Sequence, residues 1–331
     1  MPDTLVDRFG RVHTSLRISV TDRCNIRCFY CMPLENVQFQ PRAEILTFEE
    51  IQRLVRVGSD LGIRKLRLTG GEPLVRSDLP KLVKRLRDLP GIEEIALTTN
   101  GILLDKLALQ LKEAGLDRLN ISIDTLDEDV FERITRRRSL SRVLEGIAAA
   151  QEARFASIKL NAVAIRDLSE PEIVPLARFA KQQGLELRFI EFMPLDADRA
   201  WDSGQVLSGA EIVRIVSQEV APLMPIPRDD PAQPATDFAY TDGSGKIGFI
   251  NSVTQAFCAA CNRMRLTAEG QFRNCLFSTE EWDARAILRG GGSDEDLRRL
   301  MLDCVDHKRS SHGIDSPDFQ PPARAMYQIG G

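Results

Sequence analysis

The sequence contains no uninterrupted apolar run of the roughly 18 residues that a membrane-spanning helix needs. Its opening residues are polar and lack the apolar core of a signal peptide. We find neither a Walker-type phosphate loop nor a separate basic and aromatic stretch suited to RNA. The formal net charge of −4 also disfavours a whole-chain nucleic-acid binder, although a basic pocket can lie inside an acidic protein. We therefore expect a cytoplasmic protein that acts on neither membranes nor nucleic acids.

The composition is that of an ordinary globular protein, with 43% hydrophobic and 28% charged residues. A chain of 331 residues is long enough for one large domain or two modest ones. No internal repeat is visible beyond an alternation of strand-like and helix-like segments. This alternation occupies the first two-thirds of the chain and is the main guide to the fold.

Six short apolar runs are predicted as strands: residues 16–20, 65–69, 95–99, 118–124, 158–165 and 186–192. Amphipathic stretches between them are predicted as helices: residues 49–61, 78–89, 105–114, a stretch through Glu132, 142–152 and 170–183. Thr47 and Glu50 have the spacing of a capping box before the first helix. Strands that alternate with helices indicate a parallel sheet. Six units are fewer than the eight of a closed barrel, so the pattern alone fits an open three-quarter barrel and a doubly wound sheet equally well.

After Met193 the alternation stops. Residues 222–234 hold five prolines and are predicted as a linker or surface loop. Residues 238–240 and 247–250 flank a glycine-containing turn and are predicted as a hairpin. Residues 282–288 and 294–307 are predicted as helices, and residues 310–331 as an irregular tail. We expect two parts, residues 1–200 with the barrel and residues 201–331 as a C-terminal region.

Seven cysteines carry most of the functional information. Six of them form two triplets that are far apart in the sequence, and Cys304 is left over. An odd number in a reducing compartment argues against a disulfide framework and for metal or redox chemistry. Cys304 is expected to be a small buried residue on a helix.

The first triplet is Cys24, Cys28 and Cys31, a CxxxCxxC on one short loop after the first predicted strand. Three thiolates can hold three irons of a cubane cluster, which leaves the fourth iron without a protein ligand. Such an iron can bind S-adenosylmethionine (SAM), and an electron passed to the sulfonium yields a 5′-deoxyadenosyl radical. Zinc is the alternative, but structural zinc prefers four ligands and no fourth Cys or His lies near this loop.

This loop resembles that of the radical-SAM superfamily, which places an aromatic residue before the last cysteine, here Tyr30. The superfamily's GGEP-type motif is also present as residues 70–73, after the second predicted strand. The resemblance implies that this segment, Gly71 included, meets the SAM amino group through its backbone, which glycine allows to come close. It also implies SAM contacts at Ser122 and Met193.

The second triplet is Cys258, Cys261 and Cys275. The segment 263–273 between its last two members is predicted as a hairpin, which would return Cys275 to the first two cysteines. A second cubane with an open iron is our interpretation. A zinc knuckle completed by His307 or His312 is the alternative.

Together these features resemble the GTP 3′,8-cyclase family, the first enzymes of molybdenum cofactor biosynthesis. The most specific matches are Cys258-x-x-Cys261-Asn262-Arg263-x-Arg265 and the final Gly330-Gly331. The resemblance implies an open (β/α)6 partial barrel, two [4Fe-4S] clusters, SAM, and a lyase that converts GTP to (8S)-3′,8-cyclo-7,8-dihydroguanosine 5′-triphosphate. It further implies a homodimer, an electron donor, and a downstream enzyme that forms cyclic pyranopterin monophosphate.

The implied reaction starts when the deoxyadenosyl radical removes hydrogen from C3′ of the GTP ribose, and the C3′ radical then attacks C8 of guanine. The open iron of the second cluster is implied to hold the guanine base. Catalytic roles are implied for Arg17, Gly330 and Gly331, with the double-glycine tail reaching into the site. The implied GTP contacts are Arg17, Lys65, Arg67, Thr98, Lys159, Arg188, Arg263 and Arg265.

The strand pattern supports this basic set independently of the resemblance. Arg17, Lys65, Arg67, Lys159 and Arg188 alternate with apolar residues on predicted strands. Basic side chains that point into a barrel are costly unless an anion meets them, and a triphosphate is such an anion. Two rival functions remain at this point: a peptide-modifying radical-SAM maturase, and a zinc-stabilised binding module without catalysis.

Overall fold

The computed structural model describes residues 4–195, 198 and 201–330. Its first six strands are β1 (Ser15–Ser19), β2 (Lys65–Thr69), β3 (Glu94–Thr99), β4 (Arg118–Ser122), β5 (Ser157–Ala164) and β6 (Glu186–Glu191). They run parallel to one another in chain order. All six strands expected from the sequence are therefore confirmed, with ends that differ by at most two residues.

The C-terminal region extends both edges of this sheet. Its strands are β7 (Leu223–Pro225), β8 (Thr236–Tyr240), β9 (Lys246–Ile250), β10 (Arg263–Leu266), β11 (Gln271–Arg273) and β12 (Trp282–Asp283). β9 lies parallel to β6, and β8 and β7 follow it at that edge. At the other edge β10 lies parallel to β1, and β11 and β12 follow. Two separate segments of the last third thus flank the six-stranded core.

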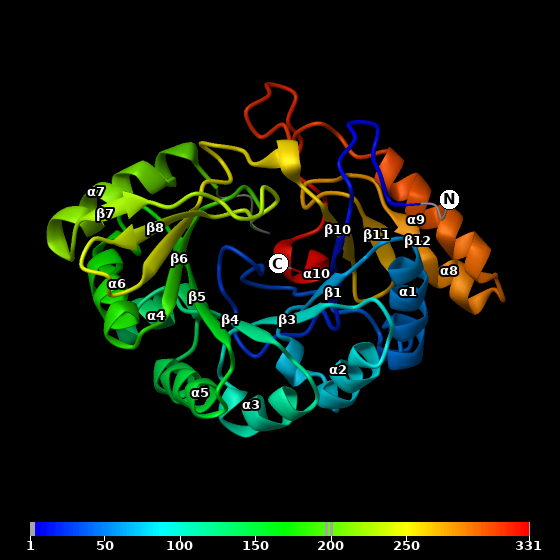
Figure 1. Cartoon of the computed structure of the whole chain (residues 1–331), viewed down its shortest axis with the longest axis horizontal. Helices are drawn as coiled ribbons and strands as arrows, with labels where there is room; N and C mark the ends of the chain where they lie inside the picture. The colour runs from blue at the N-terminus through cyan, green and yellow to red at the C-terminus, as the bar shows by residue number, and fades with distance from the viewer. Residues whose placement is uncertain (1–3, 196–197, 199–200, 331) are drawn as a thin grey trace.

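The sheet curves into an open partial barrel with its helices on the outside, and the C-terminal segment lies within the curve (Figure 1). The helices are α1 (Phe48–Asp60), α2 (Leu79–Arg87), α3 (Leu104–Glu113), α4 (Glu128–Thr135), α5 (Leu140–Glu152), α6 (Ile173–Gln182), α7 (Gly209–Glu219), α8 (Ala284–Arg289), α9 (Asp294–Asp306) and α10 (Met326–Ile329). The partial barrel is the arrangement that the family resemblance implied. No helix within the described ranges is long and apolar enough to cross a membrane.

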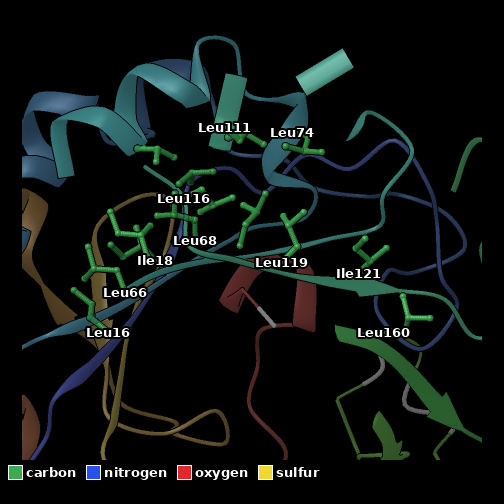
Figure 2. Close-up of a cluster of buried hydrophobic side chains, with 14 of the residues drawn as sticks. Leu16, Ile18, Leu66, Leu68, Leu74, Leu111, Leu116, Leu119, Ile121 and Leu160 are labelled. Atoms are coloured by element: carbon green, nitrogen blue, oxygen red, sulfur yellow. The ribbon is translucent and has the colours of Figure 1, made fainter. Parts of the chain in front are cut away.

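The hydrophobic core fills the space between the sheet and the outer helices. Leu16 and Ile18 of β1 and Leu66 and Leu68 of β2 are buried there (Figure 2). Because side chains alternate across a strand, the residues between them point to the inside of the curve. Arg17 and Arg67 occupy such positions. The same alternation that builds the core therefore sends cationic side chains into the barrel.

Four details of the C-terminal region differ from the sequence-based expectations. The proline-rich segment contains β7, because proline is tolerated on an edge strand such as this one. Helix α7 was missed, although Ser208 and Glu211 form a capping box at its start. Residues 282–283 are strand β12, and the helix begins after Asp283, whose carboxylate caps it. The tail, expected to be irregular, contains the single turn α10.

The capping box at the start of α1 gives a direct test of local stability. The Thr47 side chain accepts a hydrogen bond from the Glu50 N–H, and Glu50 accepts one from the Thr47 N–H. We expect Thr47→Ala to lower the free energy of unfolding by about 1 kcal/mol in chemical denaturation. Ser139→Ala is the matched control, because Ser139 precedes α5 without making a side-chain cap. Equal losses in the two variants would contradict the assignment.

Candidate functional site

The inside of the barrel holds a cavity of about 280 Å³ at the C-terminal ends of the strands. Its wall includes the first cysteine triplet, the glycine motif after β2, and arginines from four strands. The residues that line it and were expected as site residues are Arg17, Cys24, Cys28, Tyr30, Cys31, Arg67, Gly71, Thr98, Ser122, Arg188, Met193, Arg263 and Arg265. Residues from segments far apart in the sequence therefore line one cavity.

The loop with the first triplet is fixed by backbone hydrogen bonds to the end of α4. Arg27 N donates to Thr135 O at 2.9 Å and Phe29 N donates to Ile134 O at 3.1 Å. Burial raises the pKa of the Cys24 thiol to about 11, and burial together with Asp124 and the other two thiols raises that of Cys28 well above its usual value. Three half-buried cysteines whose surroundings oppose ionisation suit a cationic group that binds them together as thiolates.

The described residues bring no three Cys, His, Asp or Glu side chains close enough to hold a single metal ion. A cubane distributes its thiolates over separate irons, so its ligands need not converge on one point. The donor set, three thiols on one loop, fits such a cluster better than the four-ligand zinc site.

The glycine motif packs directly on the chain that leads into the cysteine loop. Gly71 N donates to Thr21 O, and Glu72 N donates to Arg23 O, both at 2.8 Å. A Cβ on Gly71 would lie 2.5 Å from Arg23 O, so no larger residue fits without displacing the loop. This contact positions the backbone of the motif beside the cysteines.

Glu72 is a buried carboxylate that the sequence analysis gave no role of its own. It accepts hydrogen bonds from Thr99 Oγ1 and Asn100 N, each at 2.7 Å, and from Leu74 N at 3.0 Å. Burial raises its pKa to about 7 despite these bonds. Asn100 in turn donates from Nδ2 to Asn25 Oδ1 at 2.7 Å, which links the glycine motif to the cysteine loop.

Tyr30 and Asp124 form a second link between the loop and the sheet. Tyr30 donates to Asp124 Oδ2 at 2.6 Å, and Val163 N donates to Asp124 Oδ1 at 2.8 Å. Burial raises the pKa of Asp124 to about 6. Sequence reasoning did not select Asp124, and its one available signal was its position just after β4.

The register of the sheet places cations of neighbouring strands side by side. Arg265 of β10 pairs with Arg17 of β1, which pairs with Arg67 of β2. Burial lowers the pKa of Arg17 and of Arg67 well below the usual value, and their arginine neighbours add to the effect. In the described part of the chain, neither Arg17 nor Arg67 has an ion pair. Because arginine stays protonated, this row calls for an anion in the cavity.

Lys65 and Lys159 are not among the residues that line the cavity. The Lys65 ammonium lies 3.5 Å from Asp230, with its side chain 43% exposed. Lys159 forms an ion pair of 2.9 Å with Glu186, which also binds Arg188 Nε at 2.6 Å. Lys65 lies two residues before Arg67 on β2, and in the register of β5 and β6 Lys159 lies opposite Glu186, two residues before Arg188. Both lysines therefore lie outside the cavity that the arginines line.

The second triplet gathers at a smaller cavity that Cys258, Cys261 and Cys275 all line. The expected hairpin is present as β10 and β11, and it brings Cys275 back to the other two. Burial opposes ionisation of Cys261, but Arg263 and Lys308 outweigh it and lower the pKa of this thiol to about 6. The Arg263 guanidinium donates to Cys261 Sγ at 3.3 and 3.4 Å. His307 and His312 also line this cavity.

Gly330 lies between the ends of β1 and β2, where a Cβ would come within 2.6 Å of Thr69 Oγ1. Its φ of 82° falls in the left-handed region that favours glycine. Arg265 donates a hydrogen bond to the Gly330 carbonyl. Gly331, also expected to be catalytic, lies outside the described residues. The end of the described chain is thus tied to an arginine of the cavity wall.

Comparison with known proteins decides the family. Residues 18–180 match the Radical SAM superfamily model, and residues 185–314 match the model named Molybdenum Cofactor Synthesis C. A GTP 3′,8-cyclase of Rhodopirellula baltica is 54% identical, and the match covers 100% of this chain and 93% of that protein. One of Pelotomaculum thermopropionicum is 43% identical over 98% of this chain and 99% of its own. The chain belongs to the GTP 3′,8-cyclase family.

Solved structures agree on the fold. SuiB of Streptococcus suis with its precursor peptide SuiA matches with a TM-score of 0.63 and 16% identity, over 93% of this chain and 68% of that one. SuiB bound to S-adenosylmethionine matches with a TM-score of 0.57 and 16% identity, over 82% of this chain and 63% of that one. Membership of the radical-SAM superfamily brings with it a [4Fe-4S] cluster and SAM. The loop with Cys24, Cys28 and Cys31 carries three thiols of the kind that such a cluster needs.

Glu72 gives a pH-dependent prediction. Its folded pKa of about 7 lies above the usual 4.5, so the folded state holds this proton more tightly than the unfolded state does. Its contribution to stability is therefore present at low pH and is lost as pH rises from about 4.5 to about 7, a change on the order of 3 kcal/mol. We expect Glu72→Gln to flatten this decline when urea unfolding is compared at pH 5 and pH 8.

The exposed Glu113 at the end of α3 supplies the control for this test. Glu113→Gln removes a carboxyl group without touching the buried network and should keep the wild-type pH dependence. The assignment to Glu72 would be wrong if Glu72→Gln retained the wild-type decline as well.

Proposed function

We propose that this chain converts GTP to (8S)-3′,8-cyclo-7,8-dihydroguanosine 5′-triphosphate, the first step of molybdenum cofactor biosynthesis. The observation that carries the proposal is a row of three arginines, Arg265, Arg17 and Arg67, in the same cavity as a radical-SAM cysteine loop. Among the described residues, none of the three forms an ion pair with a carboxylate. The relatives named GTP 3′,8-cyclase match the chain over its whole length. The positive charge of the cavity, the cysteine loop that shares it and the family of the chain thus all support GTP as the substrate.

The arginine row is proposed to bind the triphosphate of GTP. A triphosphate offers several negative charges, and guanidinium groups bind phosphate oxygens in pairs of hydrogen bonds. Arg188 and Thr98 line the same cavity and are proposed to complete the contact. Lys65 and Lys159 do not line the cavity and are proposed to act on GTP indirectly. Lys159 would act through its ion pair with Glu186, which also binds Arg188. Binding of the anion would relieve the mutual repulsion of these cations.

SAM is proposed to lie against Tyr30, Gly71, Ser122 and Met193, which share the cavity with the first triplet. When bound to a reduced [4Fe-4S] cluster, SAM supplies a 5′-deoxyadenosyl radical. Gly71 keeps the backbone of its motif close to the cysteine loop, and the Asp124–Tyr30 hydrogen bond holds that loop against the sheet. The enclosure keeps water from the reacting atoms, and the arginines orient the ribose.

Cys258, Cys261 and Cys275 are proposed to hold a second [4Fe-4S] cluster whose open iron binds the guanine base. Three observations support this: the cysteines line one cavity, Cys261 ionises readily beside Arg263, and Arg263 also faces the larger cavity. Arg263 thus stands between the two cavities. Its guanidinium can contact the cluster ligand and the substrate from one position.

The partners of the enzyme follow from the chemistry. Reduction of the first cluster needs an electron donor, and the cyclised product needs a second enzyme that forms cyclic pyranopterin monophosphate. A homodimer is proposed on the resemblance to the family. The seven cysteines are all free in the structure, which supports a reducing compartment such as the cytoplasm.

Cysteine variants separate the two proposed clusters. After anaerobic reconstitution with iron and sulfide, we expect Cys24→Ala to abolish 5′-deoxyadenosine formation from SAM. Cys261→Ala should still release 5′-deoxyadenosine but form no cyclised GTP, because only the second cluster is lost. Mass spectrometry measures both products. Cys304→Ala is the matched control, since Cys304 is a buried thiol of α9 outside both triplets.

The outcomes of this experiment discriminate between the readings. SAM cleavage by Cys24→Ala would refute the first cluster assignment, and cyclised GTP from Cys261→Ala would remove the second cluster from the reaction. Wild-type protein that releases 5′-deoxyadenosine but leaves GTP unchanged would retain the radical chemistry and exclude GTP as substrate.

The tail offers a separate test. Deletion of Gly330 and Gly331 removes the carbonyl that Arg265 binds. We expect the shortened chain to bind GTP with an affinity within a few-fold of wild type and to lose cyclisation, as read by equilibrium binding and product analysis. Unchanged turnover would exclude a catalytic role for the tail.

A further inference from the structure

Lys308 is a lysine with 4% of its surface exposed, just after α9. Lysine is seldom buried unless an anion accompanies it. Its Nζ donates to Arg263 O at 2.7 Å and to Asn274 O at 2.6 Å. Among the residues that the structure describes, no carboxylate forms an ion pair with it. Hydrogen bonds to these two main-chain carbonyls hold the ammonium in place.

The two carbonyls belong to the two segments that carry Cys261 and Cys275. Arg263 follows Cys261 by two residues, and Asn274 directly precedes Cys275. One ammonium thus joins both arms of the hairpin at their cysteines. Removal of these hydrogen-bond donors would release both arms at once.

The third cysteine segment is held by Arg11 in a similar way. Arg11 Nη1 donates to Cys258 O at 2.7 Å, and Nη2 donates to Arg309 O at 2.7 Å. Its Nε is fixed by the fully buried carboxylate of Asp7, also at 2.7 Å. Because Arg309 follows Lys308 directly, the two cations brace the same stretch of chain. All three cysteine segments are consequently tied to buried cations through their backbones.

The charges around Lys308 indicate a second role for this residue. The Cys261 and Cys275 sulfurs lie near Lys308 on one side and the Arg263 guanidinium is the other cation close to it, whereas burial lowers the pKa of His13 to about 4 and leaves its side chain neutral. A buried ammonium is costly unless an opposite charge meets it. Thiolates, the form in which cysteine binds iron, would supply that charge. The protein thus carries a counter-charge for the thiolates that would bind a cluster.

We propose that Lys308 is the positioning residue of the second cysteine site, where it braces the segments of Cys261 and Cys275 and supplies the buried positive charge that faces their sulfurs. The inference rests on the second cluster proposed above. A positive charge near a cluster favours its reduced state, so Lys308 would also raise the reduction potential of the second cluster. Lys308 acts through the cysteines and does not contact substrate.

The test uses the full chain with Cys24, Cys28 and Cys31 all changed to Ala, so that only the second site carries iron. After anaerobic reconstitution, iron content and an EPR-monitored redox titration report on that site without GTP or SAM. We expect Lys308→Met to lose more than half of the roughly four irons of the parent and to shift the remaining cluster to a more negative potential. Lys308→Arg should restore both.

Two further variants separate charge from hydrogen bonding. Lys308→Gln keeps two N–H donors without the charge and should show the negative shift with smaller loss of iron. If Lys308→Met fails to fold, as judged by circular dichroism, Lys308→Gln decides the question. Arg309→Met removes the same formal charge from an exposed neighbour that lines the same cavity, where water screens the charge, and it should shift the potential less than Lys308→Met does.

Parent-like iron content and potential in Lys308→Met and Lys308→Gln would overturn the inference, as would an equal shift in Arg309→Met. A parent that binds no iron at this site would overturn the second cluster as well. The expected shifts in the Lys308 variants, together with no cyclised GTP from the wild-type protein, would retain the inference and refute the proposed substrate.

Discussion

The mutual repulsion of cations on neighbouring parallel strands is the constraint on which the site depends. The pleat of β1 and β2 sends leucine and isoleucine outward to the helices and sends Arg17 and Arg67 inward. The pairing of β10 with β1 then adds Arg265 to the same row. Such a row is stable only with an anion in the cavity. The alternation of apolar and basic residues along these strands therefore produces both the hydrophobic core and the anion site.

The two cysteine triplets lie in different electrostatic surroundings. Around Cys24, Cys28 and Cys31 burial and neighbouring thiols raise the pKa, so binding of a cationic cluster provides the charge that ionises them. Around Cys261 the protein itself supplies positive charge through Arg263 and Lys308. The first site thus depends on its cofactor for charge balance, whereas at the second site the fold favours the thiolate of Cys261, although burial still raises the pKa of Cys258.

Local patterns predicted the local features well. The alternation predicted the six strands, β2 with the same ends as observed, and the Thr47–Glu50 spacing predicted the cap of α1, but the pattern did not decide the strand order. Features set by distant packing were not predictable. The pairing of β10 with β1 joins segments about 250 residues apart, and Asp124 and Lys308 are single charged residues whose burial no pattern reveals. Prolines concealed β7 because an edge strand tolerates them.

The most direct test of the central claim is the fate of the 3′ hydrogen of GTP. The reconstituted enzyme would be incubated anaerobically with SAM, a reductant and GTP that carries deuterium at C3′. The account predicts that 5′-deoxyadenosine gains one mass unit from the substrate while GTP is cyclised. Unlabelled 5′-deoxyadenosine formed alongside unchanged GTP would contradict it, because the arginine-lined cavity would then not present this ribose to the radical.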